Sequence, residues 1–456
     1  MLNDSSINAK KKLKNIKWRE IFILQEFKCY LSNSDFIEIS TLNQFLREKL
    51  RQQVLYKVKL NPEFLLQFPN YFYRKEFDIE SEFDKELETI PNFQSNRIDP
   101  FMTDLIRVLN SFDSDLLQIE FDRLYRPGYY IVPCVSKFGH LTGLSICDCE
   151  LELKGFNKFI QELDKLEYLS IKNIEFLILA EENPLNPETF LPNTLKELEL
   201  GYMNLKKVYY NNTPYEYLFY DRSGFLDSNH HITAQKLPNL KKLKVSMDST
   251  YISSYFPSLM DLNPQLKQLA IPCYYLSSSA VKPLSNAGNL NELHIAFKTD
   301  YNEFRRFDFM PLESVNSLSI KLIPSSQYRK VYTLVNLCQK ITKFNASLDS
   351  YSDEFIKRVL KKLDHLKTIE LEIKDFTLEE FDLSIFSNME SLKLNITSNE
   401  MIRYKLPEQL FNLKSIKITS NNYKDCFNFM LEEYSNSPTW NIKLLGKAIR
   451  CRAITS

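Results

Sequence analysis

The feature that most constrains this 456-residue chain is a short apolar motif that returns about every 25 residues. The motif reads apolar-x-x-apolar-x-apolar, and its twelve copies begin at Leu116, Leu141, Leu166, Leu195, Leu240, Leu266, Leu290, Val315, Ile341, Leu366, Met389 and Leu413. The spacings between starts are 25, 25, 29, 45, 26, 24, 25, 26, 25, 23 and 24 residues. A fixed period of this length indicates a repeat architecture, in which each unit buries its apolar face only by stacking on its neighbours.

Each repeat predicts one strand and, in several copies, one helix. The x-apolar-x-apolar end of the motif has the period of two that a strand with one buried face requires. The intervening residues are long enough for a crossover to a parallel neighbour. Two intervals show apolar residues at helical spacing, one of them after a possible N-cap at Ser352: Phe156, Phe159, Ile160 and Leu163; Phe355, Val359, Leu360 and Leu363.

The repeat resembles the leucine-rich-repeat family, which implies an α/β fold: an irregular solenoid with a curved parallel sheet and outer helices. The family places an Asn or Cys after each strand. Cys149 and Asn421 occupy that position here, but other copies carry Ile174, Tyr274, Lys298 or Thr397. We therefore expect irregular turns, and Trp440 and Ile442 in phase predict either a thirteenth strand or a terminal cap.

The amino-terminal segment does not follow the repeat and is predicted to form short helices. Residues 30–60 resemble the later part of an F-box followed by a first repeat strand at Leu55, Val58 and Leu60. The matching residues are Leu31, Ser32, Asp35, Phe36, Ile39, Ser40, Leu42, Asn43, Phe45 and Leu46. Arg19 and Glu20 stand where an F-box usually begins with Leu-Pro.

The F-box resemblance implies that these helices bind the adaptor subunit of a cullin-RING ubiquitin ligase. The residues that would contact the adaptor are Phe27, Leu31, Asp35, Phe36, Ile39, Leu42 and Phe45. The alternative is a plain helical cap that shields the open end of the repeat stack. The chain then divides into a flexible basic tail (1–17), an F-box-like segment (18–54) and a repeat solenoid (55–456) with an insertion near 201–238 and a terminal cap near 437–456.

Composition argues against several other functions. The chain has 58 Lys plus Arg against 58 Asp plus Glu, so it lacks the basic excess typical of nucleic-acid or membrane binding. With 8 glycines it contains no phosphate-cradling loop, and no cofactor is predicted. His140, Cys147 and Cys149 have the composition of a metal site, but the repeat explains their spacing, so no metal is predicted. We expect no enzymatic activity and a cytoplasmic or nuclear protein with reduced thiols.

Polar residues between the buried ones on parallel strands form an open face, which the family resemblance makes the substrate-binding side. Glu197 and Glu199 should lie beside Lys242 and Lys244, which gives this face a mixed charge. The long interval near 201–238 is rich in tyrosine, and Tyr215, Tyr217 and Arg222 are candidates for partner contacts. Leu205, Val208 and Tyr210 equally fit an extra strand.

Taken with the resemblance, these features predict the substrate-recognition subunit of an SCF-type ubiquitin ligase. The amino-terminal helices would bind the adaptor, and the repeats would bind an unknown protein substrate. The alternative is a leucine-rich-repeat interaction scaffold or regulator without a ligase role.

Overall fold

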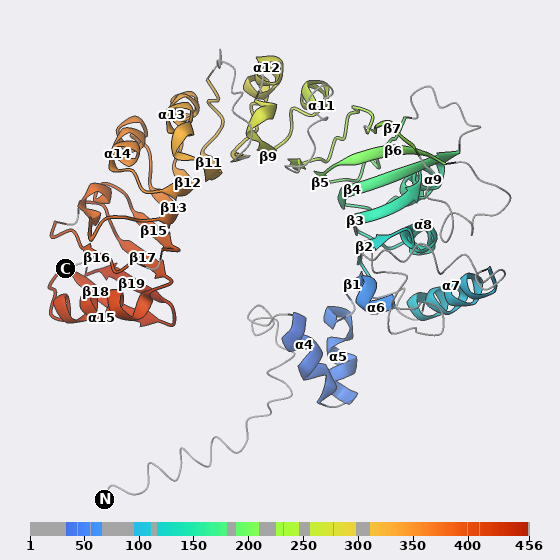
Figure 1. Cartoon of the computed structure of the whole chain (residues 1–456), viewed down its shortest axis with the longest axis horizontal. Helices are drawn as coiled ribbons and strands as arrows, with labels where there is room; N and C mark the ends of the chain where they lie inside the picture. The colour runs from blue at the N-terminus through green and yellow to red at the C-terminus, as the bar shows by residue number, and fades with distance from the viewer. Residues whose placement is uncertain are drawn as a thin grey trace, which may run out of the picture. The chain divides into compact units, whose positions relative to one another are not determined.

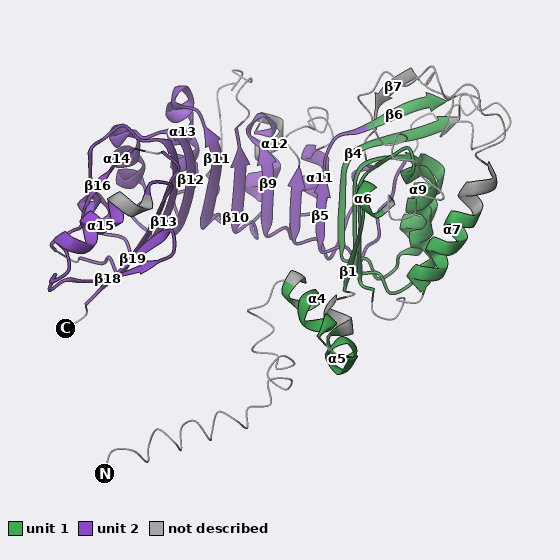
Figure 2. Cartoon of the chain, turned by 60° about the horizontal axis from the view of Figure 1, so that its bottom comes forward, with its two compact units in different colours: residues 1–185, 204–228 green, residues 186–203, 229–456 purple. Residues whose placement is uncertain are grey.

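The computed structural model describes residues 33–42, 44–54, 56–65, 95–110, 116–179, 188–208, 225–230, 232–245, 256–276, 278–297, 311–398, 400–409 and 411–454. These residues form a mixed α/β structure in which strands pair mostly in parallel (Figure 1). They belong to two compact units (Figure 2). Unit 1 lies within residues 1–185 and 204–228, and unit 2 within residues 186–203 and 229–456.

Unit 1 begins with a helix pair and continues into the first repeat strands. Its helices are α4 (Asn33–Thr41), α5 (Gln44–Val54), α6 (Pro62–Leu65), α7 (Ser95–Asn110), α8 (Gly128–Ile131), the 3-10 helix η4 (Val132–Lys137) and α9 (Leu153–Glu162). Its strands are β1 (Lys57–Leu60), β2 (Gln118–Tyr125), β3 (Gly143–Glu152) and β4 (Tyr168–Leu179), with β6 (Met203–Val208) and β7 (Phe225–Asn229) apart from one terminal residue each.

The strands of unit 1 pair in register at the positions that the repeat predicts. β1, β2, β3 and β4 are parallel neighbours, and Leu60, Phe121, Ile146 and Ile171 occupy one row across them. The expected first strand therefore exists, and it runs from Lys57 to Leu60. β6 pairs with β4, and its Leu205 and Val208 are buried, so this part of the long interval is an extra strand.

A bulge interrupts the repeat strands at one equivalent position. Arg123, Asp148 and Asn173 lie 25 residues apart and have φ values of 55°, 50° and 51°, and Leu322 has φ 58° in β11 (Ser317–Ile323). The strand register shifts beside Arg123 and Leu322. A left-handed residue of this kind bends the strand locally. In β3 and β4 the parallel pairing resumes after it, from Cys149 and Ile174 onward. Asp and Asn tolerate the conformation better than Arg or Leu.

Unit 2 contains the rest of the repeats. Its helices are α11 (Phe256–Leu262), α12 (Ser278–Asn286), α13 (Tyr328–Leu337), α14 (Asp353–Lys362), α15 (Tyr423–Glu433) and the 3-10 helices η5 (Cys273–Tyr275), η6 (Ser325–Gln327) and η7 (Leu383–Phe386). Its other strands are β5 (Glu197–Leu200), β8 (Lys242–Val245), β9 (Gln268–Pro272), β10 (Glu292–Ala296), β12 (Lys343–Ser350), β13 (Thr368–Asp375), β14 (Glu380–Asp382), β15 (Ser391–Ile396), β16 (Arg403–Lys405), β17 (Ser415–Ser420), β18 (Trp440–Leu445) and β19 (Ala448–Ala453).

The main sheet of unit 2 is parallel along nearly its whole length. The order of neighbouring strands is β5-β8-β9-β10-β11-β12-β13-β15-β17, and every pair in this series is parallel. Helices α11 to α14 lie on one side of it, where the crossovers return (Figure 1). The side away from these helices is called the open face below.

The core consists of the apolar residues of the repeat motif. All 36 residues of the twelve predicted triads are at most 6% exposed. The two predicted helices also form: Phe156, Phe159 and Ile160 are buried in α9, and the Ser352 hydroxyl accepts a hydrogen bond from the Phe355 amide at the start of α14. Since each triad faces the helices and its neighbours in adjacent repeats, stacking supplies the interior that one repeat lacks.

The last two strands differ from a thirteenth parallel step. β18 and β19 form an antiparallel hairpin, and β19 pairs antiparallel with β17. Gly446 has φ 60° in the two-residue connection, a conformation that glycine adopts without strain. Trp440 is buried, and its indole nitrogen donates to the Pro407 carbonyl over 2.8 Å, which seals this end of the core.

Candidate protein-binding surfaces

The open face of unit 2 carries two rows of polar side chains that cross the strands in register. The first row is Glu199, Lys244, Ala270, His294, Ser319, Asn345, Glu370, Lys393 and Lys417. The second row is Glu197, Lys242, Gln268, Glu292, Ser317, Lys343, Thr368, Ser391 and Ser415. Both rows lie between buried residues, because side chains alternate between the two faces of a strand.

The four predicted substrate contacts on β5 and β8 lie together and pair with one another. Lys242 Nζ lies 2.7 Å from Glu197 Oε1, and Lys244 Nζ lies 2.5 Å from Glu199 Oε1. Each cation faces a carboxylate on the neighbouring strand, so the charges at this end of the open face neutralise each other. Tyr215, Tyr217 and Arg222 lie outside the described residues.

His294 lies at the middle of the open face, as the alternation predicts. Its Nε2 is 3.1 Å from the Gln268 amide nitrogen and 3.5 Å from Glu292 Oε2. Burial lowers the pKa of His294, and the Glu292 carboxylate opposes that shift. These contacts fix the ring within a polar row.

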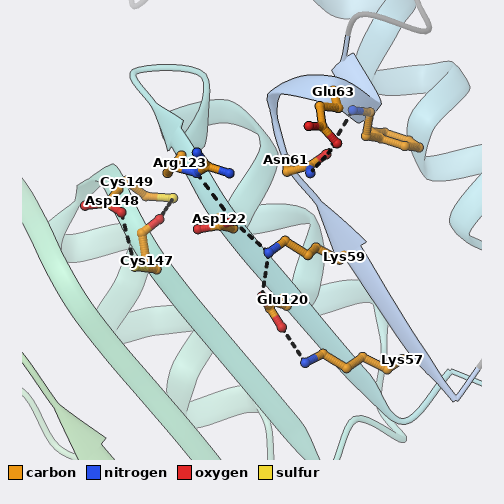
Figure 3. A network of polar contacts seen from close by, with 11 residues as sticks. Lys57, Lys59, Asn61, Glu63, Glu120, Asp122, Arg123, Cys147, Asp148 and Cys149 are labelled. Carbon is orange, nitrogen blue, oxygen red and sulfur yellow. Dashed lines mark hydrogen bonds and ion pairs between the residues drawn. The ribbon is translucent and has the colours of Figure 1, made fainter. Parts of the chain in front are cut away.

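In unit 1, charged side chains of β1 and β2 form a dense network of contacts between the two strands (Figure 3). Lys57 and Lys59 of β1 both contact Glu120 of β2, and Lys59 Nζ is also 2.7 Å from Asp122 Oδ2. Hydrogen bonds from Asp122 and Glu120 raise the pKa of Lys59. For Glu120, burial raises the pKa, but Lys57 and Lys59 together hold it below its ordinary value. The network therefore fastens β1 to β2 through charge as well as backbone pairing.

Asp122, Cys147 and Asp148 bring possible metal-ligating atoms within 4.8 Å of one another. Their carboxylates already have protein partners: Asp122 pairs with Lys59, and Asp148 accepts from the Asn173 amide and from the Cys147 thiol. Burial and the Asp148 carboxylate raise the pKa of Cys147 to about 12. His140 of the predicted composition instead lies 3.1 Å from Lys165 Nζ.

Burial also disfavours the thiolate form of three other cysteines. Cys134, Cys338 and Cys451 have pKa values raised to about 12 by burial. Cys149 is buried, and its Sγ donates to the Cys147 carbonyl. No disulfide joins any of the seven described cysteines.

Glu150 is a buried carboxyl whose charge is only partly compensated. Its side chain is 14% exposed, and Arg126 Nε is 3.9 Å from Oε1. Its Oε2 is buried with no hydrogen-bond partner in the described structure. Burial raises the pKa of Glu150 to about 7, although Lys206 and Arg126 act in the opposite direction.

Helices α4 and α5 pack on each other, and Leu46 and Leu50 of α5 are 2% and 0% exposed. Three large apolar side chains in this region remain in solvent: Ile37 of α4, Leu42 of the connection and Phe45 of α5 are 51%, 67% and 42% exposed. We call these three residues the apolar patch. Of the predicted adaptor contacts, Leu42 and Phe45 belong to it.

The other predicted adaptor contacts are less informative. Asp35 and Ile39 are half-buried on α4. Phe27, Leu31 and the side chain of Phe36 lie outside the described part of the chain, as do the basic tail (1–17) and the first predicted helix.

Three basic residues of the open face were not among the predicted contacts. The terminal hairpin adds Arg450 and Arg452 of β19 and Lys443 of β18, with Arg450 opposite both Lys417 and Lys443, and Arg452 opposite Ser415. The alternation Ile449-Arg450-Cys451-Arg452 is the signal that would have found the two arginines, since Ile449 and Cys451 are buried.

A groove of about 1020 Å³ lies beside these residues, along the loops that precede β12, β13, β15 and β17. Two exposed apolar side chains line it: Phe411 and Ile454, which are 64% and 47% exposed. Lys367 and Lys414 also line it, and both contact Glu390.

No protein-family model matches the chain, and no curated protein sequence matches it. Among solved structures, it is similar to a protein from Bacteroides fragilis at 15% identity and a TM-score of 0.30, over 60% of this chain and 68% of that chain. It is also similar to a leucine-rich-repeat protein from Leptospira interrogans at 16% identity and a TM-score of 0.29, over 66% of this chain and 65% of that chain, which is less than two thirds of its length.

Sequence identities and TM-scores this low do not define the fold. The observations that describe it are the register of the strands and the burial of the triads. These are consistent with a leucine-rich-repeat-like fold with a large, mostly parallel sheet. Among the described helices, none has the length and apolar character to span a lipid bilayer.

Proposed function

We propose that this chain is a non-enzymatic recognition scaffold, an irregular leucine-rich-repeat solenoid whose open face binds a protein partner. The observation that carries the proposal is the regular array of polar side chains across nine parallel strands of unit 2, from β5 to β17. Such an array offers many contact points at fixed spacing without requiring any of them to react. It contains both signs of charge, which favours a protein partner over a polyanion.

We further propose that α4 and α5 bind the adaptor subunit of a cullin-RING ubiquitin ligase, which makes the scaffold an SCF-type substrate receptor. The apolar patch supports this finer assignment. A cap buries its apolar side chains against the repeats, whereas Ile37, Leu42 and Phe45 are exposed. Exposed apolar side chains on a helix are what groove recognition by another protein's helices requires.

In this role the chain catalyses no reaction. It holds a substrate near a separately bound ubiquitin-conjugating enzyme, and the gain comes from effective concentration. The role places the chain in the cytoplasm or the nucleus, in keeping with cysteines that stay thiols.

The test is capture of purified adaptor by the full chain, by a chain lacking residues 1–54, and by point variants. We expect the full chain to bind and the truncated chain to fail. Leu42→Asp and Phe45→Asp should abolish capture and leave the melting temperature within about 2 °C, because substitutions at exposed positions cost little stability. Lys49→Asp, an exposed change on α5, the helix that carries Phe45, is the matched control and should bind normally.

Two outcomes would contradict the ligase role. Adaptor captured by neither the full nor the truncated chain would remove it and leave the plain scaffold. A large loss of stability in Leu42→Asp or Phe45→Asp, comparable to that of the buried Leu46→Asp, would show that the patch packs within the protein as a cap.

A further inference from the structure

The carboxyl-terminal end of the open face has a charge unlike the rest of unit 2. The residues of β15, β17, β19 and β18 on this face are Ser391, Lys393, Asn395, Ser415, Lys417, Thr419, Ala448, Arg450, Arg452, Asn441, Lys443 and Leu445. Five of them are cations and none is an acid. We call Lys417, Lys443, Arg450 and Arg452 the basic corner.

The basic corner is not neutralised from within. Lys393 pairs with Glu370 at 3.5 Å, but within the described part of the chain no carboxylate lies in ion-pair distance of the four corner residues. At the other end of the same sheet, Lys242 and Lys244 each have a glutamate partner. The corner is therefore a cluster of cations without ion-pair partners among the described residues.

The corner also places like charges directly opposite one another. Arg450 lies between Lys417 on β17 and Lys443 on β18, as the register of the three strands requires. Like charges opposite each other on neighbouring strands destabilise a sheet. A bound anion between these side chains would relieve that repulsion, so the arrangement favours an acidic ligand.

The groove lies next to the corner along β17 and β19. Ala453 and Lys414 line it, and they directly precede or follow Arg452 and Ser415 in β19 and β17. Arg450 and Arg452 of β19 and the groove residue Ile454, which follows this strand, lie at two-residue steps along the chain. A ligand in extended conformation repeats its side chains on one face at the same interval of about 6.8 Å.

We propose that this end of unit 2 binds an acidic, extended segment of a partner protein that carries one bulky apolar side chain. The apolar side chain enters the groove against Phe411 and Ile454. Two residues further along the ligand a carboxylate meets Arg452, and after two more a second carboxylate meets Arg450, Lys417 and Lys443. The pattern of the ligand is apolar-x-acid-x-acid, in either chain direction.

The chemistry of the corner favours a protein over a nucleic acid. Single-stranded nucleic acids are held by aromatic side chains on which bases stack, together with a basic groove. None of the twelve open-face residues of β15, β17, β18 and β19 is aromatic, so Phe411 of the groove has no aromatic neighbour among them on which successive bases could stack. Arginine forks bind carboxylates through two parallel hydrogen bonds, which suits the two arginines here.

The proposal rests on the scaffold role, since it names the chemical class of segment that the scaffold recognises. The probe is a fluorescein-labelled peptide, GSFSESESG, titrated with the full chain and followed by anisotropy. We expect saturable binding that weakens as salt rises. Replacing both glutamates by glutamine should weaken binding about 100-fold, and replacing the phenylalanine by serine should weaken it about 10-fold.

The matching protein variants test the residues. Arg450→Gln with Arg452→Gln should lower peptide affinity about 100-fold, and it should not lower stability because it removes like-charge contacts. Lys361→Gln with Lys362→Gln on α14 makes the same charge change on exposed helix residues and should leave affinity within about 2-fold. Lys443→Glu reverses the charge at an exposed position of the corner and should also lower peptide affinity.

Several results would overturn the inference. Equal binding of the glutamine peptide, unchanged affinity in the arginine variant, or tighter binding of a single-stranded oligonucleotide of equal charge would each do so. Adaptor capture is measured on the same preparations. If the chain binds the adaptor but not the peptide, only this inference is wrong. If it binds the peptide but not the adaptor, only the ligase role is wrong.

Discussion

Glu150 gives the sharpest quantitative prediction, because its environment ties the stability of unit 1 to pH. The side chain is 14% exposed, its Oε2 has no hydrogen-bond partner in the described structure, and its pKa is raised from 4.5 to about 7. The folded state therefore binds a proton more tightly than the unfolded state does. The contribution of protonated Glu150 to the free energy of unfolding is therefore fully present below pH 4.5. It is lost as the pH rises toward 7.

The magnitude follows from the two pKa values. One pKa unit corresponds to about 1.4 kcal/mol, so the full loss above pH 7 is about 3 kcal/mol, of which about 2 to 3 kcal/mol falls between pH 5 and pH 8. Glu150→Gln keeps the shape and removes the charge. The free energy of opening that governs hydrogen exchange should fall with pH in the wild type and not in Glu150→Gln. The difference between the two proteins should therefore grow by about 2 to 3 kcal/mol from pH 5 to pH 8.

Hydrogen exchange followed by mass spectrometry measures this in the intact chain, on peptides that span β3 and β4. Exchange rates are corrected for the intrinsic effect of pH before the comparison. Glu162→Gln, which removes an exposed carboxyl from α9, is the control and should stay within about 0.5 kcal/mol at both pH values. A constant difference between Glu150→Gln and wild type from pH 5 to pH 8 would refute the reasoning.

Three further predictions concern stability and reactivity. Asn263 is 1% exposed; its Oδ1 accepts from the Leu237 amide, and its Nδ2 donates to the Gln235 and Leu259 carbonyls. Because Asn263→Ala removes all three hydrogen bonds, it should lower the free energy of unfolding in denaturant by about 3 kcal/mol, and a loss below about 1 kcal/mol would contradict this. Lys340→Ala should cost less than about 1 kcal/mol in the same assay despite its ion pair with Glu313, because the two side chains are 63% and 72% exposed. Cys338 should resist a thiol reagent at pH 8 until the chain unfolds, since its pKa is about 12; rapid labelling of the folded chain would be inconsistent with that burial.

Much of the fold follows from the sequence because burial has a fixed period in a strand. Leu293 and Ile295 face the core, so His294 between them must face away, and the structure has it so. The 25-residue spacing then fixes which residues become neighbours on the next strand. The rows from Glu197 to Lys242 and from Glu199 to Lys244 were predictable for that reason.

Other features depend on information that the period does not carry. Nothing in the triads shows that the last strand runs antiparallel; that depends on the two-residue connection at Gly446. The left-handed bulge at Leu322 is equally hidden, because leucine has no preference for that conformation. The exposure of Leu42 and Phe45 is a tertiary property, since the spacing that predicts α4 and α5 does not say what covers them.

The central claim is that the triads of unit 2 stack into a parallel, in-register sheet whose opposite side binds a partner. Spin-label distances in solution test it most directly, with one label at Gln268 on β9 and the second at Thr368, Ser391 or Ser415. These positions lie in one row of the open face. Labels are attached to introduced cysteines in a background where Cys29 and Cys147 are replaced by serine.

The row predicts distances that rise with each added strand, by about 4.8 Å per step, to roughly 19, 24 and 29 Å between backbones for the three pairs. Distances that fail to increase in that order, or that spread broadly with no step between neighbouring strands, would contradict the stacked sheet. They would also contradict the two binding surfaces that depend on it, the open face and the basic corner.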